Sequence, residues 1–411
     1  MHGIAGAFRI GRLMAVQPAG ALLIAALGAG LLALPVAAQV NPGAAARPPT
    51  AAELDRAAPP AAAVPAQRAN VRSRGFAPGP CPDALANSNL TAPLKSVVFS
   101  GPGGAALPPE VAEVLAGVSA GLDGRALPLA EICRIRDTAS AALARARYVA
   151  VVQVPEQSLA DGVLQLRVTT AHIVELRVRG EPGKGKTRLE GLLAKLKALD
   201  PLNETEAERI LLLANDIPGT QVSLELRPAP SGVPGEVIGE VQLQTTAGGL
   251  VMNVQNYGSE QIGRWSGVIR GDLYGLTGMA DRTYVSLFST SDVRELLVVQ
   301  AGHDFAVGNN GLRVGVNGTY AKTKPTLPDA AAGFDLNSES MLASIFASYP
   351  LLRSTSANVK AGAGLDLIDQ RTRAIGQLIN LDQIRALWAR IDGDLQPRRL
   401  SLVAPAWRLA G

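Results

Sequence analysis

Residues 148–170 read YVAVVQVPEQSLADGVLQLRVTT, and this stretch carries the most informative pattern in the chain. Two runs rich in β-branched residues, Tyr148 to Val154 and Val163 to Thr169, flank a loop that contains proline and glycine. β-Branched residues favour strands, and proline and glycine favour the turns between them. In the second run alternate positions are apolar, as in a strand with one buried face: Leu164, Leu166 and Val168. The stretch therefore predicts two consecutive strands.

The segment upstream completes one structural unit. It predicts a strand over Lys95 to Ser100 and two helices, Pro108 to Val118 and Pro128 to Ala146. Proline is well suited to the first turn of a helix, where its missing N–H costs nothing. The order of elements is strand, helix, helix, strand, strand, which indicates a small α+β domain.

The same order occurs again immediately downstream. A strand over Ile173 to Arg179 precedes two helices, Arg188 to Leu199 and Glu204 to Asn215, and the strands Gln221 to Arg227 and Glu236 to Gln244 follow. Such internal repetition indicates two copies of one domain.

Both helices of the second copy have the sequence of a capping box. Thr187 with Glu190, and Asn203 with Glu206, place a cap oxygen and an acid three residues apart. In this motif the two side chains satisfy free backbone amides at the start of the helix. We therefore expect the helices to begin at these positions.

The segment from Gly180 to Thr187 also matches the spacing of a phosphate-binding P-loop, G-x-x-x-x-G-K-[ST]. In that interpretation backbone amides would surround a phosphate and Lys186 would reach the terminal phosphates. However, the two segments that follow are both helical, so no strand is expected to carry a Mg²⁺-binding aspartate. The sequence therefore favours an ordinary Gly/Lys-rich turn, with nucleotide binding as the alternative.

From Gly248 onward the sequence changes to short alternating segments separated by Gly, Asn, Asp and Ser. One face of each segment is apolar and the other is polar, as in the strands of a membrane barrel with a water-filled interior. A soluble β-sandwich has the same period and remains an alternative. The expected strands lie around Leu250 to Val254 and over Arg264–Leu273, Arg282–Thr290, Glu295–Asp304, Leu312–Tyr320, Met341–Tyr349, Asn358–Leu367 and Ile384–Asp394.

The N-terminus predicts export. Arg9 and Arg12 precede an apolar run, Ala19 to Leu34, that ends before small residues. This is typical of a cleaved secretory signal peptide over residues 1–38, since a membrane span needs roughly 20 apolar residues. An uncleaved anchor is the alternative. Residues 39–80 are rich in Ala and Pro, which indicates a linker in which Thr50 to Ala58 could form one short helix.

Composition excludes several classes of function. Of the 411 residues, 47% are hydrophobic and 18% charged, and the net charge is +4 with scattered basic residues. This is no footprint of nucleic-acid binding. The three histidines are isolated, so no metal site or cofactor is expected. In an exported chain the two cysteines, Cys81 and Cys133, favour a disulfide, with two unpaired thiols as the alternative.

Several motifs resemble those of two-partner secretion transporters, the TpsB or ShlB-type haemolysin secretion/activation proteins. The segment from Pro155 to Leu164 is similar to the P-x-Q-x-L-x-x-G-x-L segment of their first POTRA (polypeptide-transport-associated) domain. Cys81 and Cys133 resemble the family's paired cysteines. Where this chain has Arg147-Tyr148, the family usually has Gly-Tyr. The residues that match family motifs are Pro155, Gln157, Leu159, Gly162 and Leu164, and in the first barrel hairpins Asn256, Tyr257, Gly258, Gly278 and Asp281.

The resemblance implies a domain plan and a location. Two POTRA domains, over residues 81–170 and 171–247, would lie in the periplasm, and residues 248–411 would form the N-terminal part of an outer-membrane antiparallel β-barrel in contact with lipid. Family barrels have about sixteen strands, within the usual even-numbered range. The sequence predicts only seven or eight here, so the chain is expected to be truncated within the barrel.

The resemblance also implies a function without covalent catalysis. The POTRA pair would bind an unfolded exoprotein, a TpsA-type passenger, and the barrel would pass it outside without nucleotide or nucleic acid. A barrel-assembly protein is an alternative. An extended peptide can add to the free edge of a sheet. The candidate edge residues are Tyr148, Val149, Val151, Val152 and Val154 of one strand, and Val222 and Leu224 of another.

Overall fold

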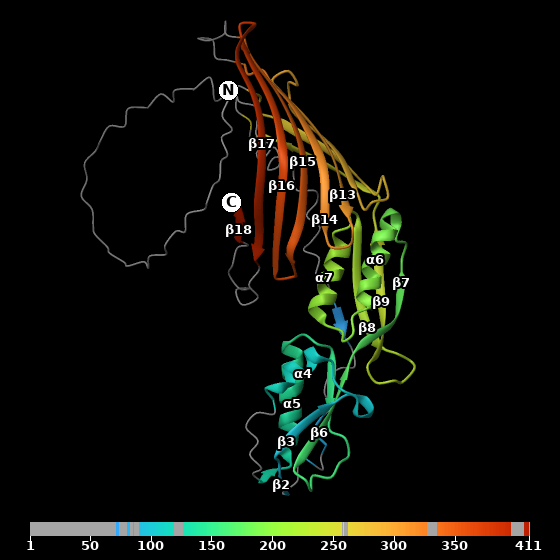
Figure 1. Ribbon diagram of the computed structural model, residues 1–411. Helices are drawn as coiled ribbons and strands as arrows, with labels where there is room; N and C mark the ends of the chain where they lie inside the picture. The colour runs from blue at the N-terminus through green and yellow to red at the C-terminus, as the bar shows by residue number, and fades with distance from the viewer. Residues whose placement is uncertain are drawn as a thin grey trace, which may run out of the picture.

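The computed structural model describes residues 71–73, 80–82, 85, 90–118, 126–256, 258, 262–326, 335–395 and 407–410. The expected signal peptide, the helix over Thr50 to Ala58 and Tyr257 lie outside these residues. Two α/β units follow one another along the chain, and the second lies between the first and a long curved sheet (Figure 1).

The first α/β unit has a three-stranded sheet. Its sheet order is β3-β6-β5, with β3 parallel and β5 antiparallel to β6. Leu164 and Leu166 of β6 are fully buried under the helices, as the alternation predicted. The elements are β3 (Ser96–Ser100), α4 (Pro109–Ala116), α5 (Ala130–Arg145), β5 (Ala150–Gln153) and β6 (Val163–Thr170).

The predicted start of the second helix in this unit is wrong. Helix α5 begins at Ala130, because Pro128 belongs to a short strand, β4 (Ala126–Pro128), that pairs with β2 (Thr91–Pro93). A short 3-10 helix, η1 (Pro102–Gly104), follows β3. The pairing with β2 holds Pro128 in an extended conformation, so it cannot start the helix.

The second α/β unit repeats the plan with a larger sheet of order β1-β8-β9-β7. Helices α6 and α7 pack on one face of this sheet (Figure 1). The added strand, β1, comes from the linker and pairs in parallel with β8. The elements are β1 (Val71–Ser73), β7 (His172–Arg179), the 3-10 turn η2 (Gly183–Gly185), α6 (Lys186–Lys197), α7 (Glu204–Asn215), β8 (Thr220–Pro228) and β9 (Glu236–Thr245).

The two predicted caps have different outcomes. Asn203 is the N-cap of α7, and its side-chain oxygen accepts a hydrogen bond from the Thr205 amide at 2.9 Å. The prediction for Thr187 is wrong. The turn η2 runs directly into α6, so the backbone is already helical at Lys186 and the cap position is Gly185, which has no side chain to offer.

The rest of the described chain forms one antiparallel sheet in which each strand pairs with the next. Strands β15 to β17 have 18, 18 and 19 residues, longer than the roughly ten of a typical membrane strand, so the predicted segments cover only parts of them. The strands are β10 (Gly248–Gln255), β11 (Ser266–Tyr274), β12 (Arg282–Thr290), β13 (Leu296–Val307), β14 (Leu312–Thr323), β15 (Leu336–Arg353), β16 (Ala357–Ala374), β17 (Gln377–Leu395) and the short β18 (Trp407–Ala410).

The two faces of this sheet have opposite polarity. The register places one apolar row across five strands, and each of its members is at least 36% exposed: Ile269, Leu287, Val299, Tyr320 and Met341. The adjacent positions form a polar row on the other face: Arg270, Ser286, Gln300 and Thr319. An apolar outer surface with a polar inner surface is the pattern of an outer-membrane barrel wall. Among the described helices, none is long and apolar enough to cross a membrane.

Candidate functional site

The edge of β5 borders a cavity in the first α/β unit. Among the described residues this strand pairs with β6 on one side only, since the sheet ends there. Val151 to Pro155 line a cavity of about 600 Å³ along that edge. A strand edge carries unpaired N–H and C=O groups, which are a template for a further strand.

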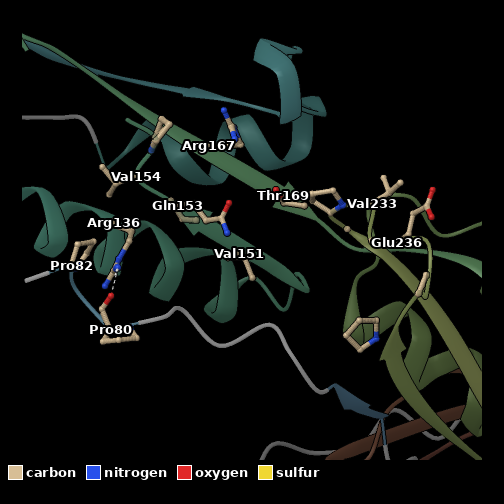
Figure 2. Close-up of a pocket in the computed structure, with 17 residues that line it drawn as sticks. Pro80, Pro82, Arg136, Val151, Gln153, Val154, Arg167, Thr169, Val233 and Glu236 are labelled. Carbon is tan, nitrogen blue, oxygen red and sulfur yellow. Dashed lines mark hydrogen bonds between the residues drawn. The ribbon is translucent and has the colours of Figure 1, made fainter. Parts of the chain in front are cut away.

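The other walls of the cavity come from two distant parts of the chain. At one end Pro80 and Pro82 lie beside Arg136, and at the other end lie Val233, in the loop between β8 and β9, and Glu236, the first residue of β9 (Figure 2). The cavity therefore spans the junction between the first and second units.

The polar groups that line the cavity differ in how many of their hydrogen bonds are formed. The guanidinium of Arg136, which is 6% exposed, donates from Nε and Nη2 to the Asp137 carboxylate at 2.9 and 2.7 Å. The Glu236 carboxylate accepts a hydrogen bond from the Ser231 hydroxyl at 2.6 Å. The hydroxyl of Thr169 is buried and has no hydrogen-bond partner among the described residues. A buried hydroxyl without a partner is costly, so a ligand that supplied one would gain from it.

Disulfide Cys81–Cys133 lies at this site. It joins the segment between the two wall prolines to helix α5, with the Cα atoms 5.8 Å apart. The bridge therefore ties one cavity wall to the helix that packs on the sheet of β5.

The seven candidate edge residues lie in three environments: along the cavity, at the joint between the two units, and on β8 in the core of the second unit. Val151, Val152 and Val154 line the cavity, and Val152 also reaches the core of the first unit. Tyr148 forms a β-bridge with Asn203, and Val149 is 4% exposed within the core of the second unit. These two residues belong to the joint between the units, and β5 is therefore shorter than predicted.

The contacts at the joint between the two units explain the unusual backbone angle of Arg147. Arg147 has φ = 66°, in the left-handed region that favours glycine. Its carbonyl accepts a hydrogen bond from the Glu204 amide at 2.8 Å, and its guanidinium pairs with the Glu204 carboxylate at 3.1 Å. These contacts across the joint offset the backbone strain.

The other candidate edge, on β8, is partly covered. The side chains of Val222 and Leu224 are buried in the core of the second unit. On the outer side β1 pairs with Leu224 to Leu226 (Figure 1). The linker strand β1 therefore covers part of the β8 edge, which was the alternative candidate to the β5 edge.

The motif between β5 and β6 extends the ladder. The Gln157 amide donates to the Gln165 carbonyl and accepts from the Gln165 N–H, both at 2.7 Å. Gln157 therefore replaces a strand partner just beyond the end of β5. Gly162 has φ = 75°, and a Cβ atom there would lie 2.7 Å from the Pro93 carbonyl oxygen, so only glycine fits. Leu159 packs against the core, and Leu164 is within it.

The barrel motif closes the turn between β11 and β12. Asp281 Oδ1 accepts hydrogen bonds from the Thr277 hydroxyl at 2.6 Å, the Thr277 amide at 3.0 Å and the Met279 amide at 3.2 Å. Burial raises the pKa of Asp281, but these hydrogen bonds outweigh it and the pKa lies below its ordinary value of 3.8. The ionised Asp281 carboxylate therefore stabilises the turn above that value, and this stabilisation is lost as the pH falls through the lowered pKa.

The remaining motif residues lie in or beside turns. Gly278 has φ = 81°, in the same turn as Asp281. Asn256 follows β10 directly, and the amide of Gly258 donates to the Arg264 carbonyl at 3.1 Å. A Cβ atom on Gly258 would collide with the carbonyl of Gly263.

Successive turns of the large sheet contact the second unit. From the β11–β12 turn, Ala280 is buried in the core of that unit. The β13–β14 turn meets α6, where Arg188 donates to the Gly308 carbonyl and Lys195 Nζ to Asn310 Oδ1 at 2.7 Å.

The turn between β15 and β16 makes a charged contact with the second unit. Arg353 donates to both carboxylate oxygens of Asp216, at 2.7 and 3.0 Å, and the Thr355 amide donates to Glu208 Oε1 at 2.6 Å. Three turns therefore hold α6 and α7 against the end of the sheet.

The P-loop-like segment takes part in the same interface. A Cβ atom on Gly275 would lie 2.6 Å from Lys184 Cβ, so this segment lies against the β11–β12 turn. Lys186 Nζ lies 3.7 Å from the Glu190 carboxylate. The next element after α6 is helix α7, as the sequence predicted, so no strand directly follows α6 to carry a Mg²⁺ ligand. Within the described residues no group of three or more His, Cys, Asp or Glu is arranged to hold a metal ion.

Comparison with known proteins gives the fold. No family model and no curated protein matches the sequence. Among solved structures, CdiB from Escherichia coli is similar over 78% of this chain, with 17% identity and a TM-score of 0.58. CdiB from Acinetobacter baumannii is similar over 75% of the chain, with 15% identity and a TM-score of 0.54. The chain spans 59% and 60% of the length of these two proteins. It has their fold, POTRA units followed by a barrel-type antiparallel sheet.

Proposed function

We propose that this chain acts in two-partner secretion, as an outer-membrane transporter that binds an unfolded exoprotein in the periplasm and passes it to the cell exterior. The fold it shares with CdiB from Escherichia coli supports this proposal, together with the motifs that resemble those of two-partner secretion transporters. In this proposal residues 81–170 and 171–247 are periplasmic POTRA domains, and residues 248–411 belong to the barrel. The apolar row on the sheet would face lipid.

The free edge of β5 is the observation that carries the proposal. An extended passenger segment can pair with the backbone of β5 while its side chains enter the cavity along Val151 to Pro155. Main-chain hydrogen bonds depend little on sequence, which suits a transporter that handles a long unfolded chain. We therefore assign the primary contact to β5 rather than to β8, whose edge is partly paired with β1.

No covalent step, nucleotide or cofactor is required by this mechanism. Folding of the passenger outside the cell supplies the direction of movement. The joint at Val149 and the three turns at the second unit connect the β5 edge to the barrel wall through packed contacts. A passenger held on β5 would therefore be kept near the periplasmic mouth of the barrel.

A deletion experiment separates transport from the alternative, barrel assembly. We expect deletion of the gene to remove one large polypeptide from the growth medium and to leave the set of outer-membrane barrel proteins unchanged. Quantitative mass spectrometry of medium and outer membrane checks this. A general fall in outer-membrane barrel proteins would instead favour an assembly function.

Photo-crosslinking then tests the assigned edge. A benzophenone amino acid at Gln153, which is exposed and lines the cavity, should crosslink to the polypeptide that the deletion removes. The matched control is Val98, which is 46% exposed on β3, the opposite edge of the same sheet. Equal crosslinking at both positions, or none at Gln153, would contradict the assignment to β5.

A further inference from the structure

One end of the cavity is formed by a short segment, Pro80 to Pro82, which we call the proline wall. Both of its prolines line the cavity. Figure 2 shows them beside Arg136, at the end of the cavity away from Val233 and Glu236. Proline has no backbone N–H, and its ring fixes φ. The wall therefore offers β5 no donor at either proline, while it presents rigid apolar surface to anything between them.

The proline wall is held by contacts with α5 and with Leu85, which packs against the core of the first unit. Cys81 is bonded to Cys133, in α5. One helical turn later, Arg136 donates from Nη1 to the Pro80 carbonyl at 3.4 Å. The Leu85 amide donates to the Pro82 carbonyl at 2.9 Å.

Helix α5 in turn is fixed relative to β5. Ile132, Ala139 and Leu143 of the helix share one core with Val152 of β5. The Cys81–Cys133 bridge therefore fixes the proline wall relative to this core. Without it, the wall would be held by the Arg136 hydrogen bond and, through Leu85, by packing against the core of the first unit.

We infer that the Cys81–Cys133 bridge positions the proline wall so that the cavity becomes a slot for one extended strand. The occupant is a segment of an unfolded exported polypeptide with small apolar side chains at alternate positions, paired with β5 and packed against the wall. This inference rests on the proposed function and adds the second wall of its binding site. Cys81 and Cys133 are positioning residues in this site.

The test uses the full chain in detergent and a synthetic probe, a fluorescein-labelled ten-residue peptide of alternating Val and Thr. Anisotropy gives the Kd for the wild type and three variants. The first is Cys81→Ser with Cys133→Ser, which removes the bridge. The second is Pro80→Gly with Pro82→Gly, which keeps the bridge and softens the wall. The matched control is Pro102→Gly, a proline in η1 that does not line the cavity.

We expect both double variants to weaken probe binding about tenfold, equivalent to about 1.4 kcal/mol, and the control to match the wild type. Thermal unfolding of the Pro80→Gly/Pro82→Gly variant should equal that of the wild type. Weaker binding at unchanged stability separates a positioning role from a merely structural one, even if loss of the bridge also destabilises the first unit.

Two outcomes would overturn different statements. The Ala171 amide donates to the Val149 carbonyl, so alternate residues from Val149 pair with β6 and the N–H of Val154 faces the cavity. Unchanged affinity in the Pro80→Gly/Pro82→Gly variant would overturn the inference about the wall, and the use of β5 would stand if Val154→Pro abolished binding. Failure of the wild type to bind the probe at concentrations on the order of 1 mM, or binding that Val154→Pro does not alter, would overturn the use of β5 itself.

Discussion

The two α/β units have the same order of main elements, but different interactions stabilise them. In the described residues, the core of the second unit contains 21 buried hydrophobic residues and that of the first contains 11. The first unit has the disulfide, and the second has none. The sheet of the second unit has four strands, and that of the first has three.

The difference teaches how a small unit can keep an edge open. A free edge strand leaves backbone groups unpaired and limits how much apolar surface the sheet can bury. The second unit covers its β8 edge partly with β1 and borrows Val149 and Ala280 from its neighbours for its core. In the described residues the second sheet still leaves its outer strand β7 open, whereas both outer strands of the first sheet, β3 and β5, are open. The unit with the smaller core, open at β3 and β5, is the one that has the covalent bridge.

The largest effect is expected from a core truncation in the second unit. Leu211→Ala removes a fully buried side chain of α7 and should lower the free energy of local unfolding by about 4 kcal/mol. Hydrogen exchange of α7 and β8 amides in the full chain measures this. Leu250→Ala, at a position 69% exposed on β10, should leave these amides unchanged. A loss below about 1 kcal/mol would mean that the large core is not what stabilises this unit.

A somewhat smaller effect is expected from removing the bridge in the first unit. The bridge closes a loop with a sequence separation of 52, so the Cys81→Ser/Cys133→Ser variant should lose about 2–4 kcal/mol. Faster hydrogen exchange should appear in α5 and β6 and be absent from α7 and β9. Equal acceleration in both units would contradict the idea that they are stabilised separately.

The sequence predicted the elements better than the contacts between them. Alternation and helical periodicity identified α7 and β12 with the bounds that the structure has, because each is bounded by clear polar or turn residues. Strand β1 was missed, since three residues in an Ala/Pro-rich linker carry no periodic signal. Thr187 failed as a cap because the preceding turn was already helical.

The candidate site was predictable in part. Val151 and Val154 were expected at an open edge and line the cavity, whereas Val149 was assigned to the same strand and lies in the core of the other unit. Single-sequence periodicity cannot separate these residues, because it does not report which neighbour a strand meets. The sequence does give one indication of the joint. Arg147 stands where the family usually has glycine before Tyr148, and the structure gives this arginine a φ of 66°, in the region that favours glycine.

The smallest effect is expected from a change at Gln157, just beyond the end of β5. Gln157 pairs with both backbone groups of Gln165, so Gln157→Ala should destabilise the β5–β6 end by about 1–2 kcal/mol. Gln157→Glu is the sharper control, because it keeps the acceptor for the Gln165 N–H but loses the donor to the Gln165 carbonyl. We expect hydrogen exchange at Gln165 to rise strongly in the alanine variant and less in the glutamate variant. If both variants exchange like the wild type, Gln157 does not act as a strand partner, and the open edge of β5 would extend further toward the loop than the structure indicates.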